Sequence, residues 1–215
     1  MKYKYVLFDL DGTLTDPYEG ISKSVIYSLQ SFGIEEDDEN ILKKFIGPPL
    51  KESFMRFYGF SEEKAQMAVA KYRERYIDTG VYENALIDGV KETLSLLKEN
   101  GVKLYLATSK PQTLAEIILN HFGIYDFFDF VGGADFNHTR DEKWQVIDYV
   151  FQSVGITDKE NAIMVGDRMH DILGAKKTGI KSLCVLCGYG DREEFEEYGA
   201  DYIVPSIADI TCFIL

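Results

Sequence analysis

The strongest constraint on the fold is an alternation of two kinds of segment along most of the chain. Short apolar runs rich in β-branched and aromatic residues are typical of strands, and segments whose apolar residues recur at helical spacing separate them. The expected strands are 3–8, 102–107, 127–131, 162–165, 182–186 and 202–204, and the expected helices between them are 90–99, 114–122, 142–154 and 172–178. Nearly continuous apolar strands joined by helices predict an α/β domain built on a doubly wound parallel sheet.

One interval interrupts this alternation. Between residues 16 and 81 the sequence contains no convincing strand, and its apolar residues follow helical spacing instead. We therefore expect residues 16–81 to form a small inserted all-α domain, and residues 1–15 together with 82–215 to form a Rossmann-like core. A chain of 215 residues is long enough for one domain of average size and a smaller one.

The chain is strongly acidic, with 23 basic and 36 acidic residues and a formal net charge of −13. Such a surface repels phosphate backbones and anionic lipids, which argues against a protein that binds a nucleic acid polymer or a membrane. No apolar stretch approaches the ~18 residues that span a bilayer, so we expect a cytoplasmic protein. Cys184 and Cys187 have C-x-x-C spacing but lie in an apolar run without a second pair, and we expect both to be buried strand residues.

Two aspartates stand directly after the first expected strand, in Asp9-Leu-Asp-Gly-Thr-Leu-Thr-Asp16. If the backbone stays extended, Asp9 and Asp11 face the same way, and Gly12 then permits a sharp turn. Two carboxylates ~4 Å apart repel each other by about 4 kcal/mol at an effective dielectric of 20. A divalent cation relieves this repulsion, and carboxylate oxygens suit Mg²⁺.

Further polar side chains stand where other strands end. Thr108 follows the strand 102–107, Asp167 follows the strand 162–165, and Asp171 comes four residues later, at or near the start of a helix. The carboxyl ends of parallel strands meet at one edge of the sheet, where α/β domains bind their ligands. These groups are therefore expected to lie close to Asp9 and to hold Mg²⁺ together with a phosphoryl group.

A cation is needed at the same edge to balance the carboxylates. Lys143 lies on the first turn of the expected helix 142–154 and is the favoured source of this charge. Lys110 and Arg140 are the alternatives.

These residues resemble, in type and order, the four motifs of the haloacid dehalogenase-like (HAD) phosphohydrolases. The matching segments are Asp9-x-Asp-Gly-Thr-Leu-x-Asp16, a hydrophobic strand that ends in Thr108, Lys143, and Gly166-Asp-x-x-x-Asp171. The position of the insert resembles the helical cap of the phosphoglycolate phosphatase and β-phosphoglucomutase branch. The resemblance covers essentially the whole chain, and it implies a cap domain whose closure excludes water.

The resemblance also implies a role for each residue. Asp9 is the nucleophile that becomes an aspartyl phosphate, and Asp11 protonates the leaving oxygen and later deprotonates the attacking water. Thr108 and Lys143 bind the transferring phosphoryl group.

Three groups are implied to hold Mg²⁺: the Asp9 carboxylate, the Asp11 backbone carbonyl and the Asp167 carboxylate. Asp171 is implied to support this metal site rather than to bind the ion directly.

The expected function is hydrolysis of a small phosphorylated metabolite, either phosphoglycolate-like or a nucleoside monophosphate, by a Mg²⁺-dependent phosphatase. A phosphomutase of the β-phosphoglucomutase type is an alternative, because it needs the same phospho-aspartate chemistry. A phosphorylation-switched binding module is a second alternative, but its acceptor aspartate would follow a middle strand of an uninterrupted domain.

Overall fold

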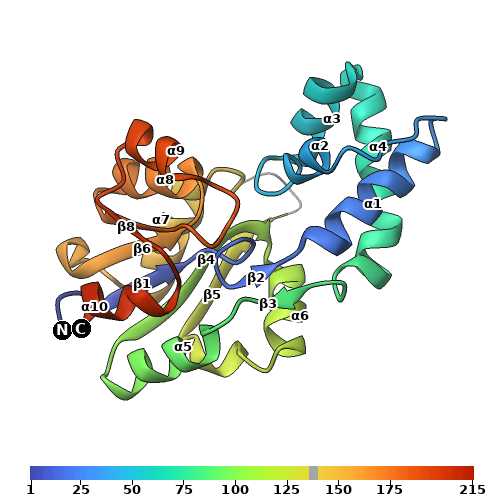
Figure 1. Ribbon diagram of the computed structural model, residues 1–215. Coiled ribbons are helices and arrows are strands. Elements are labelled where there is room, and N and C mark those ends of the chain that lie inside the picture. The colour runs from blue at the N-terminus through green and yellow to red at the C-terminus, as the bar shows by residue number, and fades with distance from the viewer. Residues whose placement is uncertain (136–139) are drawn as a thin grey trace. The chain divides into compact units, whose positions relative to one another are not determined.

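The computed structural model describes residues 1–135 and 140–215, and its central feature is a six-stranded parallel sheet (Figure 1). In spatial order the strands are β5 (Phe130–Ala134), β4 (Lys103–Pro111), β1 (Tyr5–Phe8), β6 (Ala162–Gly166), β7 (Lys181–Val185) and β8 (Tyr202–Val204). Each neighbouring pair is parallel. The carboxyl ends of all six strands therefore lie at one edge, as the doubly wound prediction requires.

Helices cover both faces of this sheet. The connections through α5 (Val90–Glu99) and α6 (Gln112–His121) lead toward β5, whereas those through α7 (Lys143–Val154), α8 (Met169–Thr178) and α9 (Arg192–Tyr198) lead toward β8. Because crossovers between parallel strands are right-handed, the two groups lie on opposite faces (Figure 1). The remaining short helices of this region are η2 (Tyr125–Phe127), η3 (Lys159–Asn161), η4 (Ala208–Ile210) and α10 (Thr211–Ile214).

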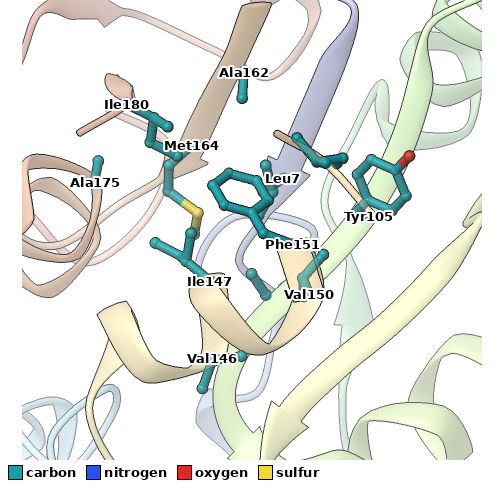
Figure 2. Packing of buried hydrophobic residues seen from close by; sticks show 12 residues of the cluster. Leu7, Tyr105, Val146, Ile147, Val150, Phe151, Ala162, Met164, Ala175 and Ile180 are labelled. Carbon is teal, nitrogen blue, oxygen red and sulfur yellow. The ribbon is translucent and has the colours of Figure 1, made fainter. Parts of the chain in front are cut away.

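The helix α7 packs against the sheet through one apolar face, which its sequence pattern explains. Apolar residues at 146, 147, 150 and 151 share one face of the helix, and Figure 2 shows this face packed against side chains of the sheet. Leu7, Tyr105 and Met164 supply the opposing surface from β1, β4 and β6. This packing fixes α7, and with it the first residue of the helix, relative to the carboxyl edge of the sheet.

The contacts divide the chain into two compact units, Met1–Thr15 with Leu86–Leu215, and Asp16–Ala85. The second unit contains α1 (Tyr18–Gln30), α2 (Glu39–Lys43), α3 (Leu50–Tyr58), α4 (Glu62–Arg75) and the π-helix η1 (Tyr76–Gly80). Its interior is aromatic, with Phe54 packed between Phe45 and Phe60 at ring-centroid distances of 5.1 and 6.0 Å. A two-stranded sheet pairs β2 (Thr15–Asp16) with β3 (Ala85–Leu86).

The predicted α/β class with a parallel sheet flanked by helices is confirmed, and all six predicted strands are present. β4 continues four residues beyond the predicted end at 107, and the short elements β2, β3 and α9 were not predicted. The prediction for Cys187 is wrong: Cys184 is buried in β7, but Cys187 lies beyond the end of that strand and is exposed.

Among residues 1–135 and 140–215, none of the helices combines the length and the apolar character needed to cross a lipid bilayer.

Candidate active site

Three carboxylates that are distant in sequence meet at the carboxyl edge of the sheet. Asp9 directly follows β1 and Asp167 directly follows β6, and these strands are neighbours, with Phe8 opposite Val165. Asp171 lies in the first turn of α8. One carboxylate oxygen from each of the three lies within 4.8 Å of the others, and we call this group the acidic cluster. The structure thus brings together the three aspartates that the sequence predicted at this edge.

A tight turn after β1 brings the backbone up against the acidic cluster. The carbonyl oxygen of Leu10 accepts hydrogen bonds from the backbone N–H groups of three following residues, 13, 14 and 15. Gly12 has a φ of +84°, and a Cβ at this position would lie 2.1 Å from Oδ2 of Asp167. Only glycine therefore fits the turn, both because of its left-handed backbone and because of the space that Asp167 occupies.

Asp167 is completely buried and held by donors from two loops. The hydroxyl of Thr13 donates to its Oδ1 at 3.1 Å, and the backbone N–H of Tyr189 donates to its Oδ2 at 2.8 Å. Burial, and then the charges of Asp171 and Asp9, raise the pKa of Asp167 well above its ordinary value. A cation bound at this position would stabilise the charged form of Asp167.

The loop after β7 contributes to the site in a way that the sequence analysis missed. Gly188 and Gly190 flank Tyr189, and a Cβ at either glycine would lie within 2.5 Å of an Asp167 atom. The two glycines thus allow the loop backbone to approach Asp167 closely enough for the Tyr189 N–H to reach it. The G-x-G spacing after a predicted strand was the available signal.

Lys143 is the first residue of α7, and its ammonium group lies between two members of the acidic cluster. Its Nζ is 2.8 Å from Oδ1 of Asp9 and 2.9 Å from Oδ1 of Asp171, and it also donates to the carbonyl of Ala107 at 3.1 Å. Only 3% of the side chain is exposed. Burial alone would lower the pKa of Lys143, but the two carboxylates together raise it, so the lysine stays charged.

The start of α7 is fixed by local hydrogen bonds. The side-chain oxygen of Gln145 accepts from the backbone N–H of Glu142 at 2.9 Å, which is half of a capping box. Behind Lys143, a Cβ on Gly174 of α8 would lie 2.7 Å from the lysine Cγ, so this glycine leaves room for the lysine stem. Helix capping and helix–helix packing therefore both determine where the ammonium group lies.

Asp171 has both of its oxygens occupied by protein donors. Its Oδ2 accepts from the backbone N–H groups of Asp167 and Arg168, each at 3.1 Å, and its Oδ1 pairs with Lys143. Burial raises the pKa of Asp171 to about 6, and the negative charge of Asp9 adds to the effect while Lys143 opposes it. These contacts make Asp171 a support for the Asp167 loop and for the ammonium group of Lys143.

Asp11 has a cationic partner of its own. Nζ of Lys110, near the end of β4, lies 2.5 Å from Oδ2 of Asp11, and the side chains are 6% and 14% exposed. Burial raises the pKa of Asp11, although Lys110 opposes this effect. Lys110 and Lys143, which the sequence analysis treated as alternatives, therefore both lie at the site: Lys110 pairs with Asp11, and Lys143 pairs with Asp9 and Asp171.

Thr108 and Arg140 complete the account of the predicted positions. Thr108 is buried in β4, two residues before Lys110, whose backbone N–H donates to the threonine hydroxyl at 3.2 Å. Arg140 donates to the carbonyl of Gly133 and lies over the ring of Tyr149, 3.9 Å from its centroid. These contacts lie outside the acidic cluster, so among the described residues the two lysines supply the positive charge found there.

The donor chemistry of the acidic cluster fits a hard divalent cation. Carboxylate oxygens converge from three positions, Asp167 and Asp171 are buried and Asp9 is partly buried, and the positive charge of one lysine faces two of the carboxylates. Asp9 and Asp171 already share the positive charge of Lys143, whereas the described contacts of Asp167 are a hydroxyl and a backbone N–H, so the charge of Asp167 would be offset most by a bound ion. The same edge carries a buried hydroxyl and two ammonium groups, which suit the oxygens of a phosphoryl group.

Residues 6–185 match the sequence model of a family described as haloacid dehalogenase-like hydrolase. The chain is 43% identical over 208 residues to a 5′-nucleotidase from Pseudomonas aeruginosa, and the match covers 97% of this chain and 94% of that protein.

Two solved structures share the fold along nearly the full length of the chain. A predicted phosphatase from Clostridium acetobutylicum is 45% identical with a TM-score of 0.94, covering 100% of this chain and 99% of that one. A haloacid dehalogenase-like family hydrolase from Streptococcus pneumoniae is 30% identical with a TM-score of 0.93 and the same coverage.

Proposed function

The chain belongs to the haloacid dehalogenase-like hydrolase family and is a phosphatase of that family, and on this premise we propose that it hydrolyses small phosphomonoesters with Mg²⁺ through an aspartyl-phosphate intermediate. The observation that carries the proposal is the position of Asp9. Its carboxylate is placed by the end of β1, paired with Lys143 and adjacent to Asp167. A carboxylate in this setting can attack phosphorus while the nearby positive charge offsets its repulsion from a phosphate dianion.

In the first half of the reaction, an oxygen of Asp9 forms a bond to phosphorus as the bond between phosphorus and the leaving oxygen breaks. Asp11 gives its proton to that leaving oxygen, which departs as an alcohol. Burial favours the protonated form of Asp11 that this step requires. Thr108 donates a hydrogen bond to a phosphoryl oxygen, and the positive charge of Lys143 beside Asp9 stabilises the negative charge that the phosphoryl oxygens carry in the transition state.

In the second half, Asp11 accepts a proton from water as the water oxygen bonds to phosphorus. The bond between phosphorus and Asp9 breaks, which releases inorganic phosphate and restores the Asp9 carboxylate and the protonated Asp11. The carboxylates of Asp9 and Asp167, with the backbone carbonyl of Asp11, would hold the metal ion. When bound, Mg²⁺ supplies positive charge that polarises the phosphoryl group and reduces repulsion among the carboxylates.

We propose nucleoside monophosphates as the first substrate class to test, because the relative from Pseudomonas aeruginosa is named a 5′-nucleotidase. Phosphoglycolate-like esters are the second class, because of the motif resemblance described above.

The test is a panel of nucleoside monophosphates, phosphoglycolate, hexose phosphates and p-nitrophenyl phosphate, assayed with Mg²⁺ for released phosphate and for isomerised sugar phosphate. We expect the enzyme to release phosphate, EDTA to abolish this activity, and added Mg²⁺ to restore it. We expect Asp9→Asn to lower turnover on the order of 10³-fold or more, because an amide is a poor nucleophile. Turnover that persists in Asp9→Asn, or isomerisation in place of phosphate release, would contradict the proposal.

The matched control is Asp148→Asn. Asp148 lies on α7 and its side chain is 36% exposed, with Lys159 at 3.6 Å. Because this aspartate contacts no member of the acidic cluster in the described contacts, we expect Asp148→Asn to retain wild-type turnover. Thermal unfolding of both variants shows whether either change affects folding.

A further inference from the structure

We infer that Lys110 is a positioning residue that fixes the carboxyl group of Asp11 and thereby determines which of its oxygens delivers the proton to the leaving group. The inference rests on the proposed function, in which Asp11 is the acid. It starts from the buried pair between Lys110 and Oδ2 of Asp11, at 2.5 Å.

The backbone around Lys110 holds the lysine in place. β4 pairs with β5 up to Thr108, and the register then shifts before the next pair at Pro111. Within this irregularity the Lys110 N–H donates to the hydroxyl of Thr108. Lys110 thus lies in β4 two residues after Thr108, which we propose binds the phosphoryl group, and only 6% of the lysine side chain is exposed.

The two oxygens of Asp11 have different surroundings. Oδ2 accepts from the ammonium group of Lys110, whereas Oδ1 is buried and has no hydrogen-bond partner among the described residues. An ammonium group has donors only and cannot accept a hydrogen bond. When Asp11 is a carboxylic acid in this arrangement, its proton therefore lies on Oδ1, and Oδ1 is the oxygen that has a proton to give to the leaving group.

Burial distinguishes this pair from an ordinary surface ion pair on the same strand. Lys103, at the other end of β4, pairs with Asp129 at 3.0 Å but is 52% exposed. An exposed pair of that kind has little effect on structure, whereas a buried lysine that contacts a buried carboxylate restricts its rotation. Lys143 does not take over this role in the structure, because its short contacts are to Asp9 and Asp171.

The experiment compares Lys110→Met with wild type on two esters, p-nitrophenyl phosphate and a simple alkyl phosphate. Nitrophenolate departs without a proton, whereas an alkoxide needs one. General acid catalysis contributes about 10²–10⁴-fold. We expect kcat/KM, which reports the first phosphoryl transfer, to fall at least about tenfold more for the alkyl ester than for the nitrophenyl ester. A structural loss that acts through the amount of folded enzyme would lower both values equally.

Two further variants separate positioning from other effects. In an Asp11→Asn background, we expect Lys110→Met to cause no additional selective loss on the alkyl ester, because the group that Lys110 positions is already absent. Lys110→Arg keeps the positive charge, and we expect it to restore part of the alkyl activity and to remain informative if Lys110→Met folds poorly. Lys103→Met is the control lysine, and we expect it to leave both values unchanged.

An equal fall on both esters, or an additional selective loss in the Asp11→Asn background, would overturn the inference. These outcomes are separate from a failure of the proposed function. In that case the wild-type enzyme would release no phosphate with Mg²⁺, or Asp9→Asn would stay active.

Discussion

The two ends of the parallel sheet carry the same kind of ion pair in opposite environments. At the amino end, Lys181 lies 2.6 Å from Asp201, and the lysine side chain is 57% exposed. At the carboxyl end, Lys143 lies 2.8 Å from Asp9 and is 3% exposed. The distances are similar, so distance alone does not identify a functional pair. The two pairs differ in their exposure to solvent. At the carboxyl end the charged groups are shielded from water, so each charge is unfavourable unless its partner is present.

The most sensitive test of this difference is Lys143→Met. Removing the ammonium group leaves Asp9 and Asp171 buried without their shared cation, and breaking a buried pair of this kind costs about 3–5 kcal/mol. Loss of the positive charge beside the transferring group lowers turnover by a further factor of about 10²–10³. We expect a lower free energy of unfolding in urea and a large fall in phosphate release. A variant with wild-type stability and activity would show that this pair is not coupled as we describe.

A second test compares alanine substitutions at two glycines, one in the crowded carboxyl end of the sheet and one in open surroundings. Gly12 and Gly123 both have a positive φ, but a Cβ on Gly12 would lie 2.1 Å from Asp167, whereas one on Gly123 has no neighbour within 4 Å. We expect Gly123→Ala to cost about 1–2 kcal/mol, the strain of a left-handed backbone. Gly12→Ala adds overpacking of about 1–3 kcal/mol and displaces Asp167. Urea unfolding and phosphate release of both variants measure the difference, and equal effects would contradict it.

The fold was largely predictable because buried strands and helices each require a characteristic spacing of apolar residues. Continuous apolar runs such as 162–165 are typical of strands covered on both faces, and the apolar stripe of α7 indicated a helix against the sheet. β2 and β3 have two residues each and are too short to show a period. The end of β4 was placed too early because its apolar pattern stops at Ala107, while the backbone remains extended to Pro111.

The sequence predicted the position of side chains that directly follow strands. It did not predict contacts made by a backbone N–H group or by a long, flexible side chain. Asp9 and Asp167 were expected together because parallel strands end at one edge, although the catalytic roles assigned to them stay predictions. The partner of Asp11 could not be derived, because the four-carbon stem of Lys110 can reach several groups. The Tyr189 N–H that binds Asp167 leaves no mark in a side chain, since every residue except proline carries this donor.

The smallest effect belongs to the amino end, and Lys181→Met tests it. Asp201 keeps its hydrogen bond from the backbone N–H of Ser182, at 3.0 Å, when the lysine charge is removed. Because both partners of the ion pair also contact water, we expect the unfolding midpoint in urea to match the wild type within error and phosphate release to be unchanged. The same lysine-to-methionine change is therefore nearly silent at one end of the sheet and severe at Lys143. A large loss of stability in Lys181→Met would mean that burial does not separate the two ends, and the assignment of function to the carboxyl end would then depend on the acidic cluster alone.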